Sequence, residues 1–119
     1  MARVLIADDD RDVRESLALL LEMHGHSVVQ AWNGRDALER LHSGPPPSLI
    51  LLDLMMPVMD GWQFRRAQLG DPAVAPIPVI VISAVPEHLR RSDELRATQV
   101  FGKPFDYDSI LSMVDALPS

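Results

Sequence analysis

The segment Leu49–Leu52 constrains the fold more than any other feature of this sequence, because it is a short, uninterrupted apolar run that ends at a single aspartate, Asp53. Such a run is typical of a strand that is buried on both faces of a parallel sheet. Pro57 and the pair Asp60-Gly61 follow, and these residue types mark a loop. We therefore predict that Asp53 stands where a buried strand emerges, at the edge where open parallel sheets bind their ligands.

Apolar runs and segments with helical spacing alternate along the whole chain. This alternation predicts a parallel sheet that is covered by helices on both faces, and right-handed connections leave few topologies for it. We predict an α/β fold with a doubly wound, five-stranded parallel sheet of the flavodoxin-like order 2-1-3-4-5. The predicted strands are Val4–Ala7, His26–Ala31, Leu49–Asp53, Ile77–Ser83 (with Pro78 at its first residue) and Gln99–Phe101, and the helices are expected to begin near Asp10 or Asp12, Asn33, Trp62, Glu87 and Asp106.

Two details of this prediction concern burial. In the helix over Trp62–Leu69, we expect Phe64, Ala67 and Leu69 to be partly buried. Three histidines share no ligand spacing with the acidic residues, so we expect them at helix ends and on the surface: His24, His26 and His42.

Length and composition narrow the class of protein. A chain of 119 residues suits one domain, which we place over residues 1–119, without an output domain. The net charge of −6 and the lack of a basic stripe argue against direct binding of nucleic acid. Cysteine is absent, and no apolar run is long enough for a signal peptide or a membrane span. We expect a cytoplasmic protein that does not bind membranes.

Polar residues follow several of the predicted strands at one edge of the sheet. Three carboxylates, those of Asp8, Asp9 and Asp53, would repel each other unless a cation joined them, and Mg²⁺ suits such oxygen ligands. A raised carboxylate pKa without a metal is the alternative. Ser83 and Lys103, the only lysine of the chain, could neutralise phosphoryl oxygens at the same edge, which would leave Asp53 to act as the nucleophile.

Four segments together resemble the receiver domain of two-component response regulators, and the resemblance covers the whole chain. They are Val4–Asp10, Leu51–Gly61, Val81–Ala84 and Lys103–Phe105. The resemblance implies that Asp53 accepts a phosphoryl group from a histidine kinase or a phosphotransferase phosphohistidine. It implies that Asp9, Asp53 and the backbone carbonyl of Met55 bind Mg²⁺ directly, that Asp8 acts through water, and that Ser83 and Lys103 hold phosphoryl oxygens. It also implies a cis bond between Lys103 and Pro104.

The sequence departs from the family pattern at three places. Met55 and Val85 are apolar where the family has side chains that orient the hydrolytic water, so we predict slow self-dephosphorylation. Val100 stands where many members carry a switch tyrosine or phenylalanine, and it has no ring to turn. The stretch over residues 87–97 is polar, so we predict a short or mobile helix there.

Three functions compete. The first is a phosphoacceptor domain of a phosphorelay, which catalyses only its own phosphorylation and slow dephosphorylation and switches the surface that an unknown downstream protein binds. The second is a phosphate-independent docking module of the same fold. The third is a metal-dependent phosphatase with an aspartate nucleophile, which usually needs a second aspartate where this chain has Met55. The complete acidic set, Ser83 and Lys103 favour the first function.

Overall fold

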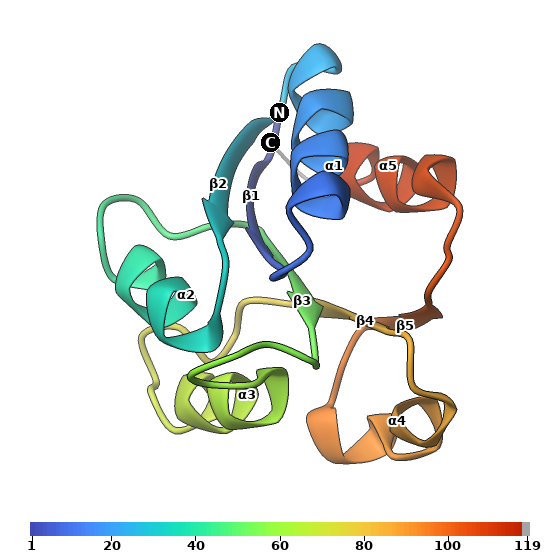
Figure 1. Ribbon diagram of the computed structural model, residues 1–119. Helices are drawn as coiled ribbons and strands as arrows, with labels where there is room; N and C mark the ends of the chain where they lie inside the picture. Colours follow the sequence, from blue (N-terminus) through green and yellow to red (C-terminus); the bar gives the residue numbers. More distant parts are fainter. Residues whose placement is uncertain (118–119) are drawn as a thin grey trace.

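A computed structural model describes residues 1–117 and shows one five-stranded, all-parallel sheet with the strand order β2-β1-β3-β4-β5 (Figure 1). The predicted fold class and strand order are therefore confirmed. The elements are β1 (Arg3–Ala7), α1 (Arg11–Met23), β2 (Ser27–Ala31), α2 (Gly34–Leu41), β3 (Leu49–Asp53), α3 (Gly61–Leu69), β4 (Val79–Ser83), α4 (Pro86–Arg90), a 3₁₀ turn (Ser92–Leu95), β5 (Gln99–Gly102) and α5 (Tyr107–Asp115).

The two central strands carry the candidate site because they are buried along their whole length. Every residue of β3 and of β4 is buried, as expected for apolar runs that are covered on both faces. The strand β4 is shorter than predicted, because its pairing with β3 begins at Val79. Pro78 lies just before the strand, and its carbonyl accepts a hydrogen bond from the Ile50 amide at 3.0 Å.

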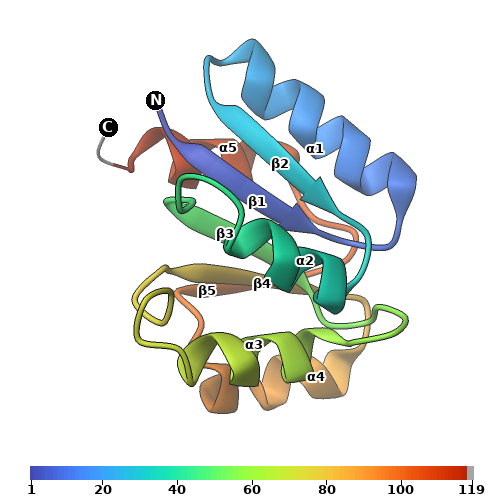
Figure 2. The same ribbon diagram turned by 90° about the vertical axis from the view of Figure 1, so that its left-hand side faces the viewer.

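Helices cover both faces of the sheet, as Figure 2 shows from the side. The helices α1 and α5 pack on one face, where the core includes Ile6, Leu17 and Ile110. The helices α2 and α3, with the turn after α4, cover the other face around Phe64 and Leu52. No helix within residues 1–117 has the length and apolar character that a membrane crossing needs.

Side-chain caps set where the helices begin. Asp10, Asn33 and Asp106 accept hydrogen bonds from the first-turn amides of α1, α2 and α5, which confirms these predicted starts. The helix α3 begins one residue before the predicted Trp62, because Asp60 and Gln63 form a reciprocal capping box. After Ser83 the chain forms only a five-residue helix and a 3₁₀ turn, so the predicted short helix is confirmed.

The predicted buried face of α3 is partly wrong. Phe64 is fully buried, but Ala67 is exposed, and two polar side chains are buried in its place, Arg65 and Gln68. The Arg65 guanidinium donates hydrogen bonds to the carbonyls of Leu95 and Arg96 and to the Gln68 side chain. This helix therefore uses polar contacts to hold the segment between α4 and β5.

The prediction of surface histidines is wrong for His26. Its ring is buried, with Nδ1 accepting from the Ala2 amide at 3.0 Å and Nε2 lying 2.6 Å from an Asp115 carboxylate oxygen. The partners come from both ends of the described chain, which a local pattern does not reveal. His24 and His42 are exposed and end α1 and α2, as predicted.

Candidate functional site

Two aspartates reach the carboxyl edge of the sheet from neighbouring strands. Asp8 follows β1 directly and Asp53 is the last residue of β3, and these strands are paired. The two carboxylates are almost fully buried, with 1 % and 3 % of each residue exposed, whereas Asp9 is exposed. One carboxylate oxygen from each of Asp8, Asp9 and Asp53 lies within 4.8 Å of the others. The chain thus brings together the three predicted acidic residues.

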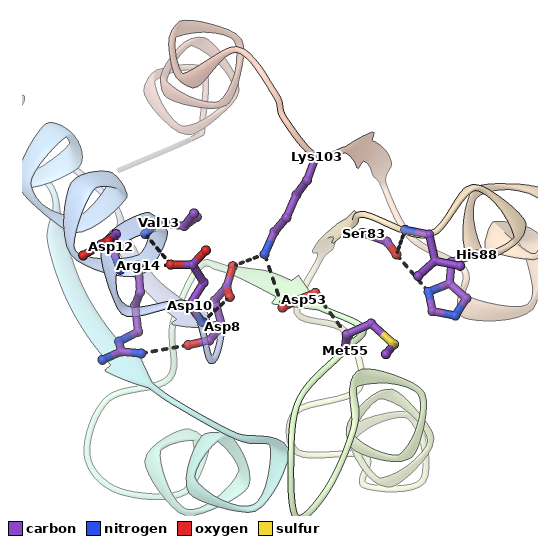
Figure 3. Close-up of polar contacts among 11 residues, drawn as sticks. Asp8, Asp10, Asp12, Val13, Arg14, Asp53, Met55, Ser83, His88 and Lys103 are labelled. Atoms are coloured by element: carbon purple, nitrogen blue, oxygen red, sulfur yellow. Dashed lines mark hydrogen bonds and ion pairs between the residues drawn. The ribbon is translucent and has the colours of Figure 1, made fainter.

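Lys103 directly follows β5, and its side chain reaches the same cluster (Figure 3). Its Nζ lies 3.0 Å from Asp8 Oδ2 and 3.4 Å from Asp53 Oδ2. Its amide donates to the Ser83 carbonyl at 2.9 Å, and the Lys103–Pro104 bond is cis, as the resemblance implies. Burial alone would lower the pKa of Lys103, but hydrogen bonding and the charges of the two carboxylates outweigh it and raise this pKa.

The Asp53 carboxyl is held in an environment that opposes its ionisation. Burial is the largest cause and the negative charge of Asp8 the next, and together they raise the pKa of Asp53 from 3.8 to about 7. The Lys103 charge and a 3.1 Å hydrogen bond from the Met55 amide to Asp53 Oδ1 act in the opposite direction. A cation at this position would relieve the remaining repulsion.

One oxygen of Asp8 is held by a backbone amide and the other faces the Lys103 ammonium. Oδ1 accepts a 2.8 Å hydrogen bond from the Asp10 amide, and Arg14 donates to the Asp8 carbonyl at 2.9 Å. Oδ2 is buried and forms the ion pair with Lys103, but it accepts no well-aligned hydrogen bond from the described residues. A buried carboxylate oxygen of this kind is suited to a metal ion or to a water bound to one.

The loop between β3 and α3 is fixed by two close backbone approaches. A Cβ on Gly61 would lie 2.6 Å from the Asp53 carbonyl oxygen, and one on Gly34 would lie 2.5 Å from the Met59 carbonyl oxygen. The Gly34 amide donates to that same oxygen at 2.8 Å. Between these glycine contacts the Met55 side chain is 55 % exposed. Any larger residue at either glycine would therefore push the loop away from its present path.

Ser83 lies at the end of β4, but its side chain is directed away from the acidic cluster. Its Oγ accepts from the Val85 amide at 3.1 Å and shares a 2.8 Å hydrogen bond with Nδ1 of His88 (Figure 3). The sequence reasoning missed His88. The signal available was a histidine on the polar segment that directly follows Ser83, but that segment offered no spacing that would aim it back at the strand.

A comparison with known families assigns the chain. The model of the response regulator receiver domain matches residues 4–115. The chain is a response regulator receiver domain. The match includes all the site residues described in this subsection.

Individual relatives support the same assignment. The receiver domain is 33 % identical to protein PilH of Pseudomonas aeruginosa over 119 residues, which cover 98 % of each chain. It is 38 % identical to the response regulator MprA of Mycolicibacterium vanbaalenii over 120 residues, but it spans only 49 % of that protein. Among solved structures, the response regulator TrrA of Thermotoga maritima in complex with Mg²⁺ and BeF superposes with a TM-score of 0.82, at 26 % identity and 97 % coverage of both chains.

Proposed function

We propose that this receiver domain accepts a phosphoryl group on Asp53 from the phosphohistidine of a histidine kinase or phosphotransferase, and that the phosphorylated form binds a downstream protein differently. The observation that carries this proposal is the buried Asp53 carboxylate with Lys103 and a second buried aspartate beside it. The arrangement suits phosphoryl transfer, because this reaction is catalysed mainly by positioning and charge neutralisation, and Lys103 and a bound cation would neutralise the charges that meet here.

The residues divide the chemistry among them. An Asp53 oxygen attacks phosphorus, the new O–P bond forms as the N–P bond breaks, and the electron pair returns to the donor imidazole. Lys103 neutralises a phosphoryl oxygen, for which it must leave its ion pairs with the carboxylates. Ser83 would donate its hydroxyl to another oxygen after it turns from its present partners. Met55 and Val85 are apolar where a polar side chain could orient the hydrolytic water, so the phosphate would be released slowly.

The acidic cluster fits a magnesium ion. The buried, non-hydrogen-bonded Oδ2 of Asp8 and the nearby oxygens of Asp9 and Asp53 are hard ligands of the type that Mg²⁺ prefers. Asp9, Asp53 and the Met55 carbonyl would bind the ion directly, with Asp8 acting through water. The ion would supply positive charge that neutralises the carboxylates and the phosphoryl oxygens. The solved structure of TrrA contains Mg²⁺ and BeF, which supports this proposal by analogy.

The proposed function implies the partners of the protein and the compartment in which it acts. The protein would act in the cytoplasm, where it would meet a kinase and a downstream protein. It would not be an enzyme in the ordinary sense, because it catalyses only its own phosphorylation and a slow dephosphorylation. The net charge of −6 remains an argument against a direct nucleic-acid partner.

The test is intact mass spectrometry after incubation with acetyl phosphate, with and without Mg²⁺. The wild type and Asp53→Asn are compared, with Asp93→Asn as a control because Asp93 is an exposed aspartate of the 3₁₀ turn. We expect one added phosphoryl group in the wild type and in Asp93→Asn, only with Mg²⁺, and none in Asp53→Asn. If the wild type takes up no phosphoryl group while Mg²⁺ still binds, the domain is a phosphate-independent docking module instead.

A further inference from the structure

We propose that His88 is a positioning residue that holds the Ser83 hydroxyl on the α4 side of the site, and that phosphorylation of Asp53 competes with this hydrogen bond. The proposal rests on the proposed function, because it concerns the hydroxyl that would bind a phosphoryl oxygen. We call the hydrogen bond between Ser83 and His88 the latch, because it ties the Ser83 hydroxyl to the surface formed by α3 and α4.

The geometry shows that the hydroxyl is fully engaged. Ser83 is 1 % exposed, and its Oγ accepts the Val85 amide at 3.1 Å. Its own proton can then be donated to His88 Nδ1, which lies 2.8 Å away. Figure 3 shows Ser83 directed toward His88, on the opposite side from the Asp53–Lys103 pair. A phosphoryl oxygen on Asp53 and the imidazole would therefore compete for one hydroxyl proton.

The imidazole connects this hydroxyl to the protein surface. The His88 ring packs edge-to-face on Trp62 of α3, with centroids 5.6 Å apart and planes at 82°. The Arg91 guanidinium lies 4.5 Å from the centroid of the same indole and pairs with Glu94 at 3.2 Å. If Ser83 leaves His88, the imidazole loses its polar anchor, and its contact with Trp62 changes.

The helix that carries His88 is short and lacks a side-chain cap. The helix α4 has five residues, and its first residue is preceded by Val85, which offers no side-chain cap. A helix this short is marginal without tertiary contacts. The Ser83–His88 bond is one of the side-chain contacts that hold α4, and releasing it can shift the population of α4 conformations. This route needs no aromatic ring at Val100.

The first experiment measures the rate of phosphorylation by acetyl phosphate with Mg²⁺. His88→Ala removes the competing acceptor, so we expect the rate to rise between about twofold and about tenfold, the range that one hydrogen bond corresponds to. His88→Gln can still accept the hydroxyl proton and should restore a rate near that of the wild type. His24→Ala, an exposed histidine at the end of α1, serves as the matched control and should not change the rate.

A double-mutant cycle separates this role from a structural one. In a Ser83→Ala background the latch has no hydroxyl to hold, so adding His88→Ala should leave the phosphorylation rate unchanged. Equal effects of His88→Ala in both backgrounds would overturn the proposal, and so would a slower rate in His88→Ala alone. Without any phosphate, the ¹⁵N shift of His88 Nδ1 should change in Ser83→Ala. It should not change in Ser109→Ala, the control, which removes a serine hydroxyl of α5 that donates to Asp106.

Fluorescence tests the connection to the surface. In a Trp32→Phe background, Trp62 is the only tryptophan, and its emission should change on phosphorylation. The change should disappear in His88→Ala, although mass spectrometry shows that the phosphoryl group is present. If Asp53 is phosphorylated and His88→Ala alters neither the rate nor this emission, the latch is wrong and the proposed function stands. If the wild type takes up no phosphoryl group, the proposed function itself fails.

Discussion

Replacing Asp53, the proposed phosphoacceptor, by asparagine should stabilise the metal-free protein, because the folded state disfavours the ionised form of this carboxyl. Burial and the Asp8 charge raise the pKa of Asp53 from 3.8 to about 7. Since the folded-state pKa is the higher one, the stability from this group is fully present below pH 3.8 and is lost as the pH rises through about 7. An asparagine at this position does not ionise, so it does not lose this stability as the pH rises.

The size of the effect follows from the pKa. A rise in the pKa of Asp53 from 3.8 to about 7 lowers the free energy of unfolding above neutral pH by at most ~4 kcal/mol. The amide introduced by Asp53→Asn would still be a buried polar group that needs hydrogen bonds, and it would lose the ion pair with Lys103, so we expect a net gain of about 1 to 2 kcal/mol. For a domain of this size that gain raises Tm by about 4 to 8 °C.

The assay is thermal unfolding followed by circular dichroism in a chelating buffer at pH 5 and at pH 7.5. Asp53→Asn should exceed the wild type in Tm at pH 7.5 and by less at pH 5. Asp93→Asn removes the same charge from an exposed position and should leave Tm nearly unchanged. Mg²⁺ should raise the Tm of the wild type and narrow its gap to Asp53→Asn. An Asp53→Asn protein that is no more stable than the wild type at pH 7.5 would refute the reasoning.

Three further predictions concern other parts of the chain. Met55→Asn places a polar side chain beside Asp53. It should shorten the half-life of the phosphoryl group on Asp53 by roughly tenfold or more, the scale of one group that positions water. An unchanged half-life would contradict the predicted slow hydrolysis. The 2.8 Å hydrogen bond between His42 and Asp71 raises the pKa of His42. The stability that this pair contributes is therefore fully present below pH 6.5 and is lost as the pH rises through the raised pKa. An NMR titration should show that Asp71→Asn returns the pKa of His42 toward 6.5. Arg65→Lys replaces three separate donor nitrogens by a single one, which cannot reach all three acceptors in their present positions. Urea unfolding should show a loss of about 1 to 3 kcal/mol. A smaller loss than that of the exposed Arg66→Lys would contradict this account.

The parts of the fold that depend on local pattern could be predicted from the sequence. Apolar runs covered on both faces predict buried parallel strands, and this holds for β3 and β4. Asn33 and Asp106 cap their helices through contacts within a few residues, so their role is visible in sequence. The edge at which Asp8, Asp9, Asp53 and Lys103 meet follows from the topology, because carboxyl ends of parallel strands share one edge.

The features that could not be predicted depend on contacts between distant residues. Gln68 is buried because its amide donates to the carbonyls of Val74 and Ile77 in the following loop, and no periodicity in α3 encodes that loop's path. The burial of His26 depends on Asp115, which is 89 residues away. The direction of the Ser83 hydroxyl depends on where the short helix α4 places an imidazole, which the polar sequence of that segment left open.

The two close approaches at Gly34 and Gly61 have a consequence for how such domains diverge. They hold the path of the loop after β3 at both ends of the segment, and the buried side chains of Leu54 and Met56 anchor the loop in the core. The residues in between include Met55 and Val58, which are 55 % and 70 % exposed and add little to the core. If Met55 sets the lifetime of a phosphoryl group on Asp53, as proposed, a substitution at this exposed position can change that lifetime while the architecture stays the same. The proposed timing of the switch would then depend on residues other than those that hold the path of the loop.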